Sequence, residues 1–66
     1  LETRAIAISR RLRLALLSDS ASPRLVAHCR PDEAAEAEPL IQALGPRAGL
    51  VADASMATGA VRIEEV

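Results

Sequence analysis

The chain has 66 residues, half of them hydrophobic, with no Phe, Tyr or Trp, one Cys, one His and a formal net charge of −1. A single Cys cannot form an internal disulfide, one Cys with one His is too few for a zinc site, and without aromatic side chains no base can be stacked. So short a chain buries only about 60% of the surface that it exposes when unfolded, so we expect one weakly stable domain with an aliphatic core.

The first residues do not have the composition of a targeting segment. Glu2 and four arginines before residue 14 interrupt any apolar signal core, and no apolar run approaches the roughly 20 residues of a membrane span. With a lone thiol, this composition predicts a cytoplasmic protein without direct membrane insertion. Leu1 is not an initiator methionine, so we expect a piece of a longer protein, with residues 1–66 as a single partial domain.

Charge is unevenly distributed along the chain. Residues 1–30 hold six Arg against Glu2 and Asp19, a balance of +4, whereas residues 31–66 hold two Arg against seven acids, a balance of −5. Such asymmetry can mark a surface for an anionic partner such as nucleic acid. We favour the alternative that the two halves face each other or their neighbours in the fold, and we predict no nucleic-acid binding because stacking residues are absent.

Residues 2–17 are predicted to form a helix with two distinct faces. At about 100° per residue, one apolar stripe would face the core: Leu1, Ala5, Ile8, Leu12, Ala15 and Leu16. The second face places two aliphatic side chains beside two cations: Ile6, Arg10, Arg13 and Leu17. Arginine and aliphatic anchors are common at docking sites, so this second face is the candidate partner-binding site. The alternative is a solvated surface with stray aliphatic side chains.

Residues 24–31 predict a short central strand. Leu25, Ala27 and Cys29 share one face, and the residues between them share the other. Adjacent strand residues point to opposite faces, so His28 and Cys29 are not expected to act together in catalysis. A buried structural Cys is favoured over a nucleophile.

A second helix is predicted to start at Pro31-Asp32-Glu33, with Asp32 capping the free backbone N–H groups. Pro39 removes a backbone donor within it, so we expect a kink or two short helices. Gly45-Pro46 ends the helix. Its inward residues are predicted to be Ala35, Leu40 and Leu44, with Ile41 as a further candidate, and Glu36 and Glu38 are assigned to solvent.

Residues 48–53 and 60–66 predict two further strands, joined by a loop in which Gly59 takes a backbone angle that other residues resist. Asp53 followed by Ser55 is ordinary turn composition. The order α-β-α-β-β predicts an α+β (α/β) fold, with a small sheet packed by two helices. The sequence shows no glycine-rich phosphate loop, nucleophile elbow or catalytic carboxylate pair, so we predict no enzymatic activity, cofactor or metal.

Three segments of the chain form a family-like pattern. An apolar strand runs into Arg30-Pro31-Asp32-Glu33, a second ends at Asp53, and an Arg-Ile-Glu strand follows Gly59. The pattern "D-x-x-[LM]-x-x-G" is matched by Asp53, Met56 and Gly59, and "C-R-[IL]-E-[TS]" by Arg62, Ile63 and Glu64, with Val61 in place of Cys and Glu65 in place of Thr. Over residues 12–66 the chain therefore resembles the C-terminal domain of the FliH/YscL family, the stator proteins of flagellar and injectisome type III secretion.

The resemblance implies a non-catalytic function in protein transport. Members of the family dimerise in their full-length form, hold the export ATPase through the C-terminal domain, and restrain ATP hydrolysis. They continue after the last strand with a further strand and helix, which implies an incomplete domain here. The family is similar in turn to a peripheral-stalk protein of the V-type rotary ATPase, which is one alternative, and an Arg-rich nucleic-acid-binding module is the other.

Overall fold

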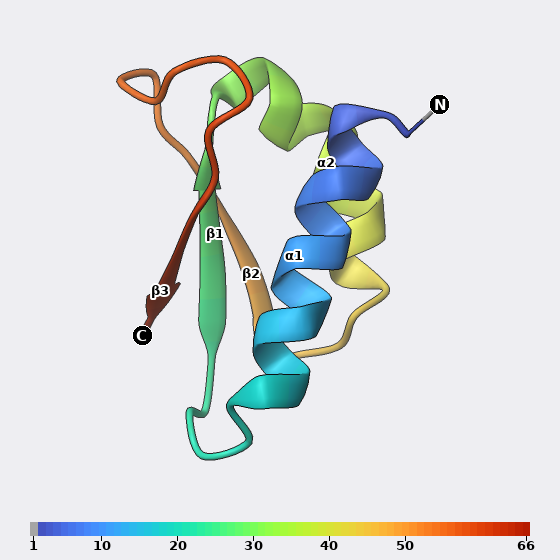
Figure 1. The fold of residues 1–66 in the computed structure, drawn as a ribbon, viewed down its shortest axis with the longest axis vertical. Coiled ribbons are helices and arrows are strands. Elements are labelled where there is room, and N and C mark those ends of the chain that lie inside the picture. Colours follow the sequence, from blue (N-terminus) through green and yellow to red (C-terminus); the bar gives the residue numbers. More distant parts are fainter. Residues whose placement is uncertain (1) are drawn as a thin grey trace.

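The computed structural model describes residues 2–66 and has two helices on one face of a three-stranded sheet (Figure 1). The elements are α1 (Arg4–Ser18), β1 (Leu25–Cys29), α2 (Pro31–Gln42), β2 (Ala48–Ala52) and β3 (Arg62–Glu65). The order α-β-α-β-β and the α+β class are as predicted. In the described part of the chain, no helix is long and apolar enough to cross a bilayer.

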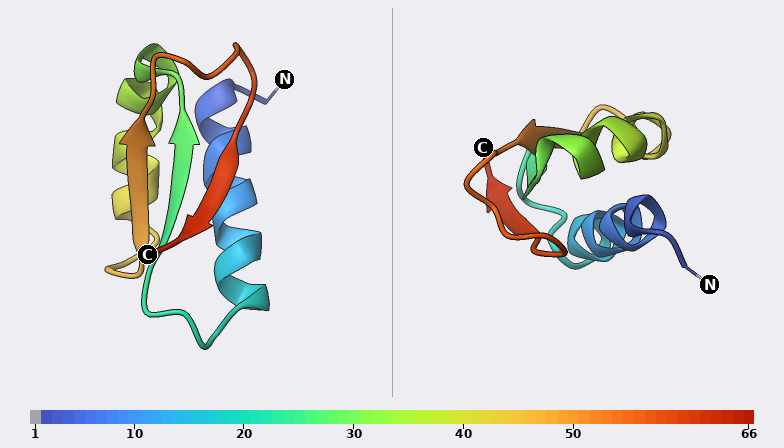
Figure 2. Two further views of the ribbon diagram at one scale, coloured as in Figure 1. Left: turned by 90° about the vertical axis from the view of Figure 1, so that its left-hand side faces the viewer. Right: turned by 90° about the horizontal axis from the view of Figure 1, so that it is seen from above.

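The sheet has β1 at its centre, as the sequence predicts. β2 pairs with one side of β1 in parallel and β3 pairs with the other side antiparallel. Figure 2 shows both helices covering the same face of this sheet. The third strand begins at Arg62 instead of the predicted residue 60, because the N–H of Ala60 donates to the carbonyl of Ala57 and keeps that stretch in a turn (3.0 Å).

The apolar stripe of α1 builds one side of the core. Ala5, Ile8 and Leu12 are buried, while Ala15 and Leu16 are partly buried against the same cluster. Leu1, the first member of the predicted stripe, lies outside the described residues. The helix starts after Thr3, whose hydroxyl oxygen accepts a hydrogen bond from the N–H of Ile6 (3.2 Å).

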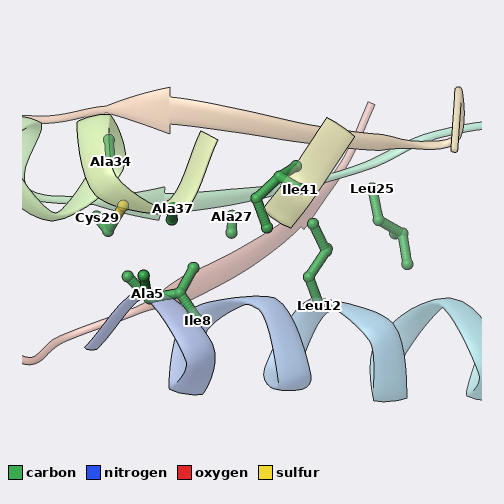
Figure 3. Packing of buried hydrophobic residues seen from close by; sticks show 9 residues of the cluster. All are labelled: Ala5, Ile8, Leu12, Leu25, Ala27, Cys29, Ala34, Ala37 and Ile41. Atoms are coloured by element: carbon green, nitrogen blue, oxygen red, sulfur yellow. The ribbon is translucent and has the colours of Figure 1, made fainter. Parts of the chain in front are cut away.

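The core lies between the two helices and the inner face of β1. Leu25, Ala27 and Cys29 of β1 point toward the helices, where they meet Ile8 and Leu12 of α1 (Figure 3). The α2 side contributes Ala34, Ala37 and Ile41. The alanines let the helices approach the sheet closely, so the small core is dense but buries little area per residue.

An arginine from the second half of the chain completes the C-terminal end of α1. Arg47 donates to the carbonyl oxygens of Leu16 (3.5 Å) and Ser22 (3.2 and 3.0 Å), and also to that of Asp19. The last carbonyls of a helix have no partner within it, and a cation suits the negative end of the helix dipole. Because α1 has no basic residue in its last turn, Arg47 supplies that charge from a distant part of the sequence.

Two predictions about α2 are wrong at the level of its backbone. Asp32 does not cap the helix: Arg30 occupies the cap position without a side-chain cap bond, and Asp32 instead accepts from the Arg30 side chain (3.3 Å). Pro39 does not divide the helix, which runs unbroken from Pro31 to Gln42. The carbonyl that loses its donor belongs to Ala35, an exposed residue on which water can take that place.

The predicted inward face of α2 is also partly wrong. Ala35 is exposed and Leu40 is 38% exposed, whereas the buried residues are Glu33, Ala34, Ala37 and Ile41. Leu44 is partly buried against the core. The prediction followed the leucines, but close helix packing selects the small alanines instead. Gly45 ends this segment with a positive φ of 104°, as expected for a residue that stops a helix.

Candidate interaction surface

The second face of α1 forms a surface that the rest of the domain leaves uncovered. Ile6 is 44% and Leu17 is 76% exposed, and Arg10 and Arg13 are also exposed. A cavity of about 260 Å³ lies along this face and is lined by Glu2, Ile6, Ser9, Arg10, Arg13 and Leu44. The structure therefore brings three of the four predicted residues together around one hollow, and it leaves Leu17 exposed outside its lining.

The charge of this surface is only partly neutralised. Arg10 forms a close ion pair with Glu2. Arg13 has no carboxylate partner in the described part of the chain, residues 2–66. Arg13 is thus a cation held beside the aliphatic side chains of Ile6 and Leu44, a combination that suits an amphipathic partner carrying negative charge.

Sequence reasoning missed two contributors to the exposed apolar surface of the helices. Leu14 of α1 is 56% exposed and Leu40 of α2 is 38% exposed. Leu40 and Leu44 were both assigned to the core because leucine spacing was used to choose the inward face of α2. The run of alanines in α2, which marks close packing, is the signal that could have corrected that choice.

His28 and Cys29 do not form a catalytic pair. They lie on opposite faces of β1, and Cys29 is fully buried, so burial and, to a lesser extent, the Glu33 carboxylate raise the pKa of its thiol. The Nε2 atom of His28 lies 2.8 Å from Oε1 of Glu64 on the outer face of the sheet. Within residues 2–66 no group of three His, Cys, Asp or Glu side chains is placed to hold a metal ion.

Glu33 has a structural role that the sequence did not reveal. It is 6% exposed, and its Oε2 accepts a hydrogen bond from the N–H of Gly59 (3.2 Å). Arg4 donates to the carbonyl of the same glycine (2.8 Å), and its Nε lies 3.8 Å from Oε1 of Glu33. The two charged side chains fix the loop between β2 and β3, and they confirm that some charge of the two halves is paired internally.

Three surface carboxyl groups accept hydrogen bonds that hold their pKa values low. The Ser22 hydroxyl and backbone N–H lower the pKa of Asp19 from 3.8 to about 2. The Ser55 hydroxyl lowers the pKa of Asp53, and His28 lowers that of Glu64. A carboxyl with a folded pKa below its unfolded value stabilises the fold above the unfolded pKa and loses that effect as pH falls through the folded pKa.

We therefore expect the free energy of unfolding to fall progressively below about pH 4.5, down to about pH 2. Urea denaturation followed by far-UV circular dichroism at about pH 6 and about pH 2.5 measures the difference. The variant Asp19→Asn should show a smaller loss between the two conditions. Equal acid sensitivity of this variant and the unmodified chain would contradict the assignment.

Comparisons of the chain with known protein families, with curated proteins and with solved structures give no match.

Proposed function

We propose that this chain is a stator or regulatory segment of a bacterial type III secretion apparatus, flagellar or injectisome, which binds and restrains the export ATPase. In this proposal it acts in the cytoplasm without catalysis, and its full-length form is a homodimer. The proposal rests on the resemblance to the FliH/YscL family carried by residues 30–33 and 53–64.

The places of the motif residues support this proposal. The Asp53 carboxylate accepts from the N–H and hydroxyl of Ser55 (2.9 and 2.6 Å), and the Asp53 carbonyl accepts from the N–H of Met56 (3.1 Å). Gly59 has a positive φ of 82°. The pattern D-x-x-M-x-x-G thus spans one tightly bonded loop whose spacing the backbone requires.

The last motif strand is also held by specific contacts. Arg62 lies 3.6 Å from Glu64, which in turn contacts His28 on the central strand. Ile63, between them, packs partly buried against the core. An Arg-Ile-Glu sequence therefore serves β3 on both faces, with the charged pair outside and the aliphatic side chain inside.

The α1 surface of Ile6, Arg10, Arg13 and Leu17 is the proposed contact with the ATPase. Exposed aliphatic side chains beside Arg13, which has no acidic partner in residues 2–66, favour an amphipathic segment with acidic residues. No side chain of the core depends on this face, because the core stripe of α1 lies on its opposite side.

The double variant Arg13→Glu and Leu17→Ser should abolish co-purification with the export ATPase, because it reverses the free charge and removes the most exposed apolar side chain of α1. Its far-UV circular dichroism should be unchanged, since both side chains are exposed. The matched control is Arg11→Glu with Leu14→Ser, also exposed on α1 but outside the proposed contact, which should keep the ATPase bound. Retention of the ATPase by the first variant would show that this face is only solvated.

A further inference from the structure

The outer edge of β2 has unpaired backbone groups. The N–H of Leu25 donates to the carbonyl of Arg47, and the N–H of Asp53 donates to the carbonyl of Cys29 (both 2.8 Å). In a parallel pair these bonds use alternate residues, so the odd-numbered residues of β2 face β1 and the even-numbered residues face outward. The N–H and C=O of Leu50 and Ala52, with the C=O of Ala48, therefore point to a side on which residues 2–66 place no strand.

This edge lacks the features that usually prevent a strand from pairing. The sequence of β2 is AGLVA, without charge or proline. β3, at the opposite edge of the sheet, is RIEE, with three charged side chains out of four. Charged residues and proline are the common means of blocking edge-to-edge pairing, and β2 has neither.

A cavity adjoins the same edge. It has a volume of about 250 Å³ and is lined by Arg24, Glu38, Ile41, Gln42, Ala48, Gly49 and Leu50. A strand added beside β2 would send alternate side chains to its two faces. Those on the helix side would reach the apolar surface of Ile41 and Leu50, and those on the other side would pass Arg24.

Arg24 sets the charge on that second side. A Cβ atom at Gly49 would lie 2.6 Å from Nη2 of Arg24 and 2.7 Å from Cγ1 of Val26, so the glycine leaves room for the guanidinium against β2. Among residues 2–66 no carboxylate pairs with Arg24. A carboxylate on the added strand, opposite Gly49, would complement this charge.

We propose that the outer edge of β2 binds an extended segment of a partner protein in which apolar and acidic residues alternate. The backbone of that segment completes the hydrogen bonds of Leu50 and Ala52. Its apolar side chains enter the cavity beneath α2, and its acidic side chains meet Arg24. This mode of recognition is strand addition, and it does not depend on the surface of α1 or on the function proposed above.

The test uses a fluorescein-labelled hexapeptide of alternating glutamate and valine, with binding to the full chain followed by fluorescence anisotropy. The same peptide with lysine in place of glutamate should bind more weakly. Two further versions are methylated on the valine amides or on the glutamate amides. One of them should lose binding and the other keep it, because only one edge of the added strand faces β2.

Ala52→Pro removes an outward N–H without removing a bond to β1, and it should weaken peptide binding at least about tenfold. Ala52→Val, which keeps the N–H, is the matched control and should bind like the unmodified chain. Arg24→Gln should weaken binding about two- to fivefold. The methylated peptides are tested on the unmodified chain, so they decide the matter even if Ala52→Pro fails to fold.

Three results would overturn the proposal. The first is no binding of the glutamate-valine peptide, and the second is the same response to both methylated peptides. The third is dimerisation of the chain, measured by sedimentation, that Ala52→Pro abolishes, because it would show that a second copy occupies the edge.

Discussion

Leu12→Ala should lower the free energy of unfolding by about 2–5 kcal/mol, the usual cost of truncating a fully buried leucine. The side chain of Leu12 is 0% exposed and lies between α1 and the inner face of β1, where Leu25 and Ile41 are its neighbours in the core (Figure 3). A core in a domain of this size rarely supplies more than about 3–5 kcal/mol. The substitution should therefore leave a large fraction of the chain unfolded, which far-UV circular dichroism during urea titration will measure.

Leu14→Ala is the matched control for this prediction. It makes the same chemical change two residues away on the same helix, but Leu14 is 56% exposed. Its effect should stay within about 0.5 kcal/mol, as for most surface substitutions. Similar losses in the two variants would show that the helix faces are assigned incorrectly.

Arg47→Met should be the next most damaging single change, with an expected loss of about 2–3 kcal/mol. Methionine retains part of the aliphatic volume but removes every donor to the carbonyls of Leu16, Asp19 and Ser22. Those carbonyls would lose a charged partner at the end of α1 and in the turn after it. Thermal unfolding and urea titration should both show the loss.

Arg11→Met tests whether the effect of Arg47→Met comes from these bonds or from loss of positive charge. Arg11 is exposed, and no ion pair joins it to an acid of residues 2–66, so its replacement should change stability little. Arg47→Lys should fall between the two, because lysine keeps the charge but not the planar set of donors. An Arg47→Met variant as stable as Arg11→Met would refute the capping role.

The elements of the fold that follow a simple periodicity could be predicted from the sequence. The stripe of Ala5, Ile8 and Leu12 recurs at helical spacing and is buried as expected. The alternation of Leu25, Ala27 and Cys29 gives β1 its inner face, and an apolar strand with both faces buried is central. In both cases local spacing and tertiary packing favour the same structure.

The misplaced features depend on contacts between distant residues. Glu33 resembles any acidic residue in the first turn of a helix, and only its contacts with Arg4 and Gly59 explain its burial. Arg47 resembles a loop arginine until α1 ends beside it. The candidate site was predicted in part: the helical period placed Ile6, Arg10 and Arg13 on one face, but Leu44 joined them only through the packing of α2.

The attachment of α1 at both ends also determines when the domain can fold during synthesis. The helix is translated first, yet Arg47 binds its C-terminal end and Gly59 binds Arg4 near its start. The central strand likewise pairs with β3, which includes Ile63. The ribosome must therefore release nearly the whole segment before α1 is held in place. Until then Ile8 and Leu12 have no complete apolar environment, so this helix is the part of the nascent chain most in need of chaperone protection.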